Sequence, residues 1–345
     1  MTTMQVCHSG LCLSVYVITF LLGFPSNILA LYTFSKKIKH KPTPIDILLL
    51  NLTISDLLFL LFLPFKMHEA SNNMHWALPY ALCPLSGFIF FMTIYNSTFF
   101  LTAISVERYL GVAFPIQHTL KRRPLYAIAA SVFFWIFSVS QLSIVFIIPF
   151  VGGEQAEINS NASSAHHNSS AAGATERTVC YENFTDTQLH ILLPVRLELC
   201  IVLFFIPFLI SSFCYINFIR ILSKLHHIDR RRKLRAIGMA LGTLLVFAVC
   251  FGPYNISHIV GFVTKKSPHW RDTALLLSTF NTCLDPLIFY FSSSAMRGNV
   301  GSVVQGIRSR LNRCLPRHVC WDSKKNINKT ARDKEHKQET INELS

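Results

Sequence analysis

Seven stretches of this chain are long enough and apolar enough to cross a lipid bilayer. Inside a bilayer every backbone polar group must bond within its own segment, so each stretch is expected to be helical. The chain is therefore predicted to be an all-α membrane protein, a seven-transmembrane helix bundle. The predicted spans are residues 12–34, 44–68, 80–111, 124–148, 190–222, 234–263 and 271–294.

The composition supports a membrane as the solvent. Charged residues make up 14% of the chain and hydrophobic residues 51%, whereas an ordinary soluble domain is about 25% charged. A soluble protein this apolar would expose large hydrophobic patches and tend to aggregate. The net charge of +14 raises the question of nucleic acid, but the positive residues fall in short clusters between apolar stretches. No nucleic-acid partner is expected.

The distribution of basic residues predicts the orientation. The first 34 residues lack the basic start of a cleaved signal peptide, and their apolar run is too long for one. Basic clusters follow the first, third and fifth spans, so these connections are expected in the cytoplasm. We predict a multi-pass plasma-membrane protein with its amino terminus outside. The clusters are Lys36, Lys37, Lys39 and Lys41, then Lys121, Arg122 and Arg123, then Lys224 and Arg230 to Arg235.

The segments outside the predicted bundle, 12–294, have distinct compositions. Residues 1–11 are expected to be extracellular. Residues 152–178 are rich in Gly, Ala, Ser and Asn, which predicts a flexible outer loop. Residues 295–315 are predicted to form an amphipathic eighth helix on the membrane, and 316–345 a disordered cytoplasmic tail. Modification is predicted as glycosylation at Asn161, Asn168 and Asn183 and palmitoylation at Cys314 and Cys320.

Short motifs occur in all seven spans. Their order and spacing resemble those of the rhodopsin-like G-protein-coupled receptors over roughly residues 12–315. The resemblance implies heterotrimeric G proteins, arrestin and membrane lipids as partners. It also implies a disulfide between Cys83 and Cys180. The motifs are Gly23–Asn27, Asn51–Asp56, Glu107-Arg108-Tyr109, Trp135, Pro207, Cys250–Pro253 and Asp285–Phe289.

Asp56 lies in the middle of the second span. An ionisable group at that depth costs at least about 2.5 kcal/mol unless it has a partner. Asn27, Ser97, Asn281 and Asp285 are candidate partners on neighbouring helices. The resemblance implies an allosteric sodium ion held by this cluster. The alternative is a hydrogen-bonded packing cluster without an ion; no other cofactor is expected.

Glu107, Arg108 and Tyr109 end the third span. The resemblance implies that Arg108 is held in the resting state and reaches the G protein in the active state. The alternative is a basic anchor whose side chain extends to the lipid headgroups. Many relatives hold this arginine with an acid on the sixth span, where this chain has Lys233. We therefore expect the resting state to be held mainly by Glu107 and by packing.

Prolines are expected to kink the later spans, because each removes a helix hydrogen bond. Pro253 lies in the sixth span, and a kink there suits an outward swing of its inner end. Phe251 stands where relatives have tryptophan. In the seventh span, Asp285 and Pro286 match the motif for activation, while Phe289 replaces the usual tyrosine.

Arg196, His258 and Arg271 lie near the outer ends of the fifth, sixth and seventh spans. Arginine offers a rigid fork of donors that matches a carboxylate. Two arginines in a partly dry pocket need an anion or acid to balance them. The alternative is that both touch lipid phosphates. Glu198 is two residues from Arg196, so one should face the cavity and the other a neighbouring helix.

A closer resemblance is to the free fatty acid receptors, above all those for short-chain acids such as acetate, propionate and butyrate. It rests on segments 180–184, 193–199, 251–258 and 290–294. It implies a carboxylate held by Arg196, Arg271 and His258, and G proteins of the Gi/o and Gq types. Further implied pocket residues are Tyr95, the lid residues Tyr181 and Glu182, and Gln141, where relatives have histidine.

Two alternative functions remain. One is a receptor for another small anion, a hydroxycarboxylate or a nucleotide, which also suits a cationic pocket. The other is a carboxylate transporter, although no internal repeat of the usual kind is visible. The sequence contains no metal set or nucleophile–base pair, so no enzymatic activity is expected.

Overall fold

The computed structural model describes residues 9–40, 42–121, 124–148, 180, 184–225 and 229–314. These residues are almost entirely helical, and none of them forms a strand. The elements are α1 Ser9–His40, α2 Pro44–Ser71, α3 Leu82–Ala113, α4 Pro115–Lys121, α5 Pro124–Leu142, α6 Ile144–Ile147, α8 Asp186–Leu199, η2 Cys200–Phe205, α9 Ile206–Lys224, α10 Arg230–Leu245, η3 Val246–Phe251, α11 Gly252–Thr264, α12 Arg271–Thr279, α13 Asn281–Ser292 and α14 Ser294–Cys314.

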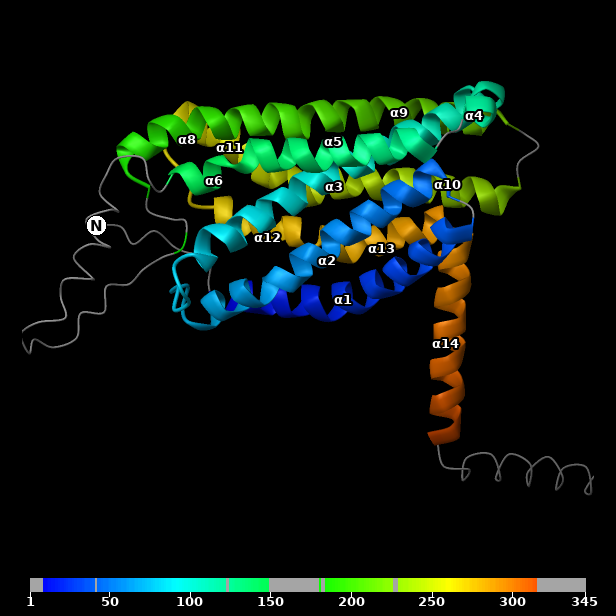
Figure 1. Ribbon diagram of the computed structural model, residues 1–345, viewed down its shortest axis with the longest axis horizontal. Coiled ribbons are helices and arrows are strands. Elements are labelled where there is room, and N and C mark those ends of the chain that lie inside the picture. Colours follow the sequence, from blue (N-terminus) through cyan, green and yellow to red (C-terminus); the bar gives the residue numbers. More distant parts are fainter. Residues whose placement is uncertain are drawn as a thin grey trace, which may run out of the picture. The chain divides into compact units, whose positions relative to one another are not determined.

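The seven predicted spans are confirmed. Seven helical segments are long and apolar enough to cross a membrane, and each overlaps one predicted stretch. Several are composed of consecutive elements that continue one another, such as α8, η2 and α9 in the fifth span (Figure 1). The segments run side by side and form the bundle. They are Ser9–His40, Pro44–Ser71, Leu82–Ala113, Pro124–Ile147, Asp186–Lys224, Arg230–Thr264 and Arg271–Ser292.

The third span, α3, is the central helix of the bundle. In its most apolar stretch 78% of residues are buried, against 28% in the first span and 22% in the fourth. A helix that is buried on nearly all sides can contact several neighbours at once. This explains why α3 contributes residues both to the outer cavities and to the cytoplasmic end described below.

Pro207 and Pro253 each lie in the first turn of a helix that follows a π-helical segment. The segments are η2 before Pro207 and η3 before Pro253. Proline lacks the N–H for a normal helical bond and its ring clashes with the preceding turn, so a wider turn accommodates it. The predicted kinks therefore take the form of π-helical turns, and Phe251, fully buried, is the last residue of η3.

Polar side chains tie the spans together inside the bundle. The indole of Trp135 donates to Oδ1 of Asn51 at 3.1 Å, which joins α5 to α2. The amide of Asn27 donates to the carbonyl oxygen of Thr282 at 2.9 Å, which joins α1 to α13. Between helices in an apolar medium such bonds have no competition from water. They fix how the spans face one another.

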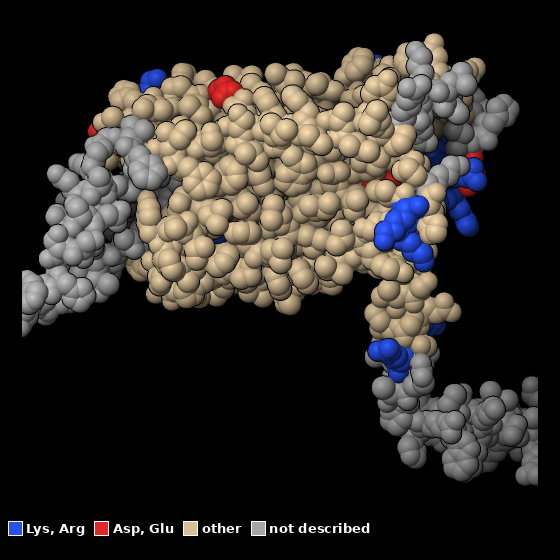
Figure 2. Space-filling model, viewed as in Figure 1, with Lys and Arg blue, Asp and Glu red and all other residues tan. Residues whose placement is uncertain are grey.

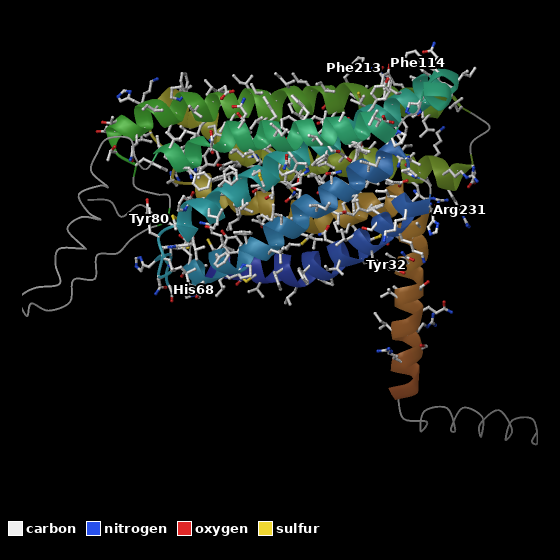
Figure 3. All side chains as sticks on the ribbon, viewed as in Figure 1. Tyr32, His68, Tyr80, Phe114, Phe213 and Arg231 are labelled. Carbon is white, nitrogen blue, oxygen red and sulfur yellow. A yellow bond between two sulfur atoms is a disulfide. The ribbon has the colours of Figure 1, made fainter. Side chains whose placement is uncertain are left out.

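The two ends of the bundle differ. Figure 3 places His68 and Tyr80 at one end, and Phe114 and Arg231 at the other. The second end carries the basic start of α10, which the sequence assigns to the cytoplasm. Between the ends, the face in Figure 2 exposes few charged side chains, as expected for a surface in contact with lipid.

At the outer end, the predicted disulfide joins Cys83 to Cys180, and their Cα atoms are 5.6 Å apart. It packs in a buried cluster with Trp76. Cys12 is also disulfide-bonded. The predicted eighth helix corresponds to α14, while its place on the membrane stays a prediction. Asn161, Asn168, Asn183, Tyr181, Glu182, Cys320 and the side chain of Cys314 lie outside the residues that the structure describes.

Candidate ligand-binding site

Arg196 occupies the last turn of α8 and points into the bundle. Its exposed fraction is 6%, and its guanidinium lies over the ring of Phe184 with 5.2 Å to the centroid. Glu198 is exposed on the surface of the bundle. The two side chains therefore face different ways as predicted. The expectation that the second one faces a neighbouring helix is wrong, because none of the described helices covers Glu198.

Arg271 is the first residue of α12 and is equally buried, with an exposed fraction of 7%. Its Nη1 donates to the hydroxyl of Ser267 at 3.3 Å, and its Nε lies 3.6 Å from a carboxylate oxygen of Asp272. A cation at a helix N-terminus is unfavourable with the helix dipole, whereas an anion there is favourable. An anionic ligand beside Arg271 would thus be stabilised both by the guanidinium and by the N-terminus of α12.

His258 and Tyr254, both in α11, lie near both arginines. Their rings pack edge to face, and both side chains are buried. Both guanidinium groups are close enough to act electrostatically on His258, Tyr254 and Tyr95. Nδ1 of His258 is buried and has no hydrogen-bond partner among the described residues. The site thus combines two cations, two phenols and an imidazole nitrogen able to bind a ligand.

A small cavity lies between α3, α5, α6, α8 and α11, with an empty volume of about 350 Å³ that includes its mouth open to solvent. Polar groups are provided by Arg196, Tyr95, Tyr254 and His258, and apolar side chains make up the rest of the wall. This mixture suits a short acid with one charged end. The other lining residues are Phe91, Leu142, Ile144, Val145, Leu192 and Leu199.

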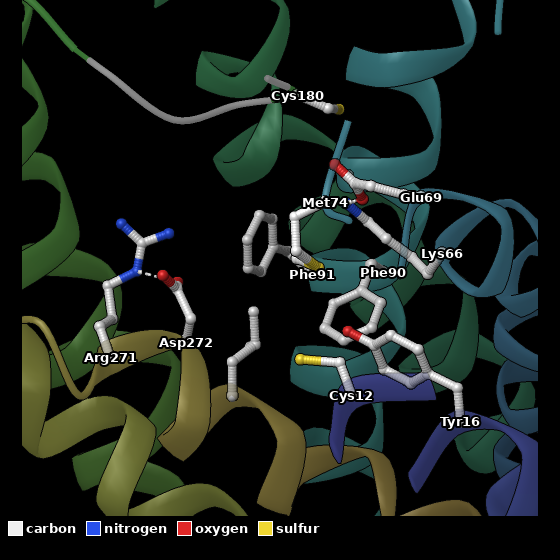
Figure 4. A pocket seen from close by; sticks show the side chains of 12 residues that line it. Cys12, Tyr16, Lys66, Glu69, Met74, Phe90, Phe91, Cys180, Arg271 and Asp272 are labelled. Carbon is white, nitrogen blue, oxygen red and sulfur yellow. Dashed lines mark hydrogen bonds and ion pairs between the residues drawn. The ribbon is translucent and has the colours of Figure 1, made fainter. Parts of the chain in front are cut away.

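A second cavity, of about 620 Å³, lies beside α1, α2, α3 and α12. Figure 4 shows Arg271 and Asp272 on one side of it, and Lys66 with Glu69 on the other. Phe91 lines both cavities and stacks on Tyr254, with centroids 6.0 Å apart and planes within 11°. Phe91 is thus a wall that the two spaces share. The remaining lining residues are Cys12, Tyr16, Met74, Gly87, Phe90, Cys180 and Leu275.

Three of the predicted ligand-binding residues, Arg196, His258 and Tyr95, line the smaller cavity. Arg271 lines the larger one and is near enough to act electrostatically on His258 and Tyr95. Gln141 is half-buried and lines neither cavity, although the next residue, Leu142, lines the smaller one. Sequence reasoning missed Tyr254 and Phe91. Helical spacing was a usable signal, because Tyr254 precedes His258 by four residues and Phe91 precedes Tyr95 by four.

Comparison with known proteins identifies the family. Residues 26–289 match the 7 transmembrane receptor (rhodopsin family). The chain is 46% identical over 303 residues to mouse free fatty acid receptor 3, with 88% of each chain covered. It is 48% identical over 295 residues to rat free fatty acid receptor 2, with 85% of each chain covered. The chain is a rhodopsin-family receptor of the free fatty acid receptor group. It is accordingly a multi-pass plasma-membrane protein with an extracellular amino terminus, from a family of receptors rather than enzymes.

Two buried carboxylates lie in the middle of this receptor. Asp56 in α2 and Asp285 in α13 are 1% and 0% exposed, and their four carboxylate oxygens have no hydrogen-bond partner among the described residues. Oδ1 of Asn27 is orphaned in the same way. Ser97 and Asn281 are buried as well, the hydroxyl of Ser97 donating to a backbone carbonyl of its own helix. Orphaned oxygens in an apolar interior need a cation or protons to balance them.

At the cytoplasmic end of the receptor, Glu107 and Arg108 bond to different elements. Oε2 of Glu107 lies 2.9 Å from Nε2 of His118 in α4. Arg108 donates to the hydroxyl and, at 3.2 Å, to the carbonyl oxygen of Ser292 in α13. Lys233 donates to the carbonyl oxygen of Ser223 at 3.0 Å. Sequence reasoning found neither His118 nor Ser292, because both partners come from outside the motif.

Proposed function

We propose that this receptor is activated by short-chain fatty acids, and that it signals through heterotrimeric G proteins of the Gi/o and Gq types. In this proposal Arg196 and Arg271 hold the carboxylate, and His258 and Tyr95 complete the site. The printed names of the relatives, free fatty acid receptors 2 and 3, support a fatty acid as the ligand. Arrestin is proposed as a further partner by resemblance.

The observation that carries the proposal is the burial of both guanidinium groups at the outer end of the bundle. At 6% and 7% exposure, Arg196 and Arg271 are too enclosed to serve as lipid-facing anchors. Asp272 is partly exposed, and its carboxylate oxygen lies 3.6 Å from Nε of Arg271. A carboxylate placed between the arginines would form charge-assisted bonds with both.

The ligand is expected to be small and its affinity modest. The cavity beside Arg196 is small: its empty volume is about 350 Å³, and this includes space open to solvent. Acetate has four heavy atoms, and at a ceiling of about 1.5 kcal/mol per atom its binding is limited to roughly 6 kcal/mol, or about 0.04 mM at best. Responses in the micromolar to millimolar range follow. A nanomolar response to acetate would contradict this site.

Activation follows from how the site is distributed over helices. Arg196 belongs to α8, His258 to α11 and Arg271 to α12. A ligand that bridges them favours the arrangement in which these outer ends are closer, and it shifts the equilibrium only by its differential affinity. The π-helical turn η3 before Pro253 is a point where the sixth span can bend. In this proposal, closer approach of the outer helix ends is coupled to an outward movement of the inner end of the sixth span, which opens a cleft for the G protein beside Arg108.

A dose series of two- to six-carbon acids on cells that express the full receptor tests the proposal, with G-protein activation as the readout. We expect Arg196→Ala and Arg271→Ala each to lower potency by about 100-fold or more, because each leaves a buried charge pair incomplete. Arg196→Lys should retain only part of the wild-type potency, because lysine lacks the planar, forked set of donors of arginine. Glu198→Gln, exposed on the same helix, is the matched control and should respond normally.

Acetate responses that persist in both alanine variants, at normal surface expression, would exclude this site. A hydroxycarboxylate or nucleotide that acts at far lower concentration than any simple acid would replace the proposed ligand. Uptake of labelled acetate without G-protein activation would favour a transporter.

We also propose that Asp56, Asp285, Ser97 and Asn281 hold a sodium ion. The donor chemistry fits, since carboxylate, hydroxyl and amide oxygens suit a hard cation. Among the described residues no three His, Cys, Asp or Glu side chains come together as metal ligands, so the proposed set relies on the serine and asparagine as well as on the two acids. A bound cation would balance the two buried carboxylates and stabilise the receptor in the state that encloses it.

A further inference from the structure

The backbone carbonyl of Leu203 in η2 accepts a hydrogen bond from another helix. In a regular α-helix this oxygen would accept from the N–H four residues on, but that residue is Pro207, which has no N–H. The hydroxyl of Thr98 in α3 lies 2.8 Å from the Leu203 oxygen and 2.7 Å from the carbonyl oxygen of Tyr95 in its own helix. A hydroxyl has one hydrogen, and the carbonyl inside α3 has a backbone donor in its helix, so the bond to Leu203 is the one that replaces a missing donor.

Further hydrogen bonds hold the fifth span to its neighbours from η2 to α9. In η2 itself, the thiol of Cys200 donates to the carbonyl oxygen of Asn255 in α11 at 3.3 Å. In α9, the hydroxyl of Ser211 donates to the hydroxyl of Thr102 in α3 at 3.0 Å, and that hydroxyl lies 3.3 Å from the carbonyl oxygen of Pro207. These contacts are buried, and together they fix how η2 and α9 are rotated about the axis of the span.

The direction of Arg196 depends on this rotation, because α8, η2 and α9 continue one another as a single span (Figure 1). Arg196 precedes Leu203 by seven residues and shares its buried face with Leu199 and Cys200, whereas Glu198 is exposed. A change of one residue in the register of η2 would rotate the helix above it by about 100°. Such a rotation is large enough to turn Arg196 away from the small cavity that it lines.

We propose that Thr98 is a positioning residue for the ligand. Its bond to the Leu203 carbonyl exists only while that carbonyl faces α3, so it favours the register of η2 that directs Arg196 into the cavity. A buried carbonyl without a donor is costly, which gives the bond its weight. The proposal rests on the proposed role of Arg196 in binding the carboxylate. Without the bond, a smaller fraction of receptors has Arg196 in place, and the apparent affinity for the acid falls with that fraction.

The test replaces the hydroxyl of Thr98 at nearly constant size, in the full receptor in membranes, with G-protein activation measured over an acetate series. We expect Thr98→Val to raise the half-maximal acetate concentration roughly fivefold, the scale of one lost buried hydrogen bond. Thr98→Ser keeps the donor and should stay close to wild type. In an Arg196→Lys background the loss caused by Thr98→Val should be smaller, because a flexible ammonium group depends less on the direction of its helix position.

Thr102→Val is the matched control. It removes the same chemical group one turn further along α3, where the span-five carbonyl in contact belongs to Pro207 and has a backbone donor four residues on. Both valine variants should lower the thermal midpoint of the purified receptor, but Thr102→Val should leave acetate potency within about twofold of wild type, because no carbonyl loses its only donor. Equal losses of potency in the two variants, or wild-type potency in Thr98→Val, would overturn the proposal.

A second measurement follows the direction of position 196 without any acid. In Arg196→Cys receptor, the rate of modification by a small water-soluble thiosulfonate reports whether the thiol faces the aqueous cavity, since a thiol in apolar surroundings forms little thiolate. Thr98→Val should slow this modification about fivefold, in step with the loss of potency, and Thr98→Ser should not. An unchanged rate would contradict the proposal. The receptor with its native cysteines gives the background, and Thr98→Ala replaces the valine variant if the latter does not reach the membrane. A wild-type receptor that ignores acetate would refute the proposed ligand and leave this comparison intact.

Discussion

Tyr254 packs edge to face against His258, with ring centroids 4.5 Å apart and planes at 74°. The same tyrosine stacks on Phe91. It therefore supports the imidazole on one side and the wall between the two outer cavities on the other. His258 depends on this contact for its orientation, because no partner of its Nδ1 is found among the described residues.

Tyr254→Ala should weaken the acetate response, because His258 loses its aromatic support. Aromatic contacts of this kind contribute about 0.5–1.5 kcal/mol, which corresponds to roughly a two- to tenfold loss of potency. Tyr254→Phe keeps the ring and should stay close to wild type unless the hydroxyl binds the ligand. Dose–response curves for both variants distinguish the role of the ring from that of the hydroxyl. A phenylalanine variant as impaired as the alanine variant would show that the hydroxyl, rather than ring packing, is what the response needs.

Phe91→Ala should change which acids work best. Removal of the shared wall would join the cavities of about 350 and 620 Å³. Each additional buried CH₂ group is worth about 0.8 kcal/mol, so five- and six-carbon acids should gain about fourfold per carbon relative to acetate. The measurement is the ratio of potencies across the two- to six-carbon series. An unchanged ratio would show that the carbon chains of the longer acids do not extend into the second cavity.

Asp56→Asn should abolish a dependence on sodium. In the wild type, replacement of NaCl by a bulky organic chloride at constant ionic strength should alter acetate potency and the thermal midpoint of the purified receptor, because a bound ion stabilises the state that holds it. The asparagine variant should respond equally in both salts. Wild-type receptor that is indifferent to sodium would leave Asp56 and Asp285 as a protonated packing pair.

Trp135→Phe should destabilise the bundle by about 1 kcal/mol, since it removes the hydrogen bond at 3.1 Å to Asn51. Thermal unfolding of the detergent-purified receptor measures this loss. In an Asn51→Leu background the additional effect of Trp135→Phe should be smaller, because the bond is already absent. Equal effects in both backgrounds would assign the loss to ring packing against Phe100 instead.

The sequence alone determined the seven spans and their direction, and its resemblance to a known family implied the disulfide. The length and apolarity of a segment are local properties, and they alone determine whether it can span a bilayer. Spans such as Arg230–Thr264 could therefore be predicted without tertiary information. The candidate arginines were also found in advance, because a charge near the end of an apolar helix stands out and its motif resembles a known one. Proline predicted where the fifth and sixth spans depart from regular helix.

Tertiary structure decided the partners. Whether Arg196 faced lipid or the interior was open in the sequence and depended on how α8 is rotated in the bundle. The pairing of Arg108 with Ser292 joins residues 184 positions apart, and Phe91 forms a wall only because α3, α11 and α12 meet there. Contacts of this kind follow from helix rotation and packing, which many residues determine together, so no single motif could have predicted them.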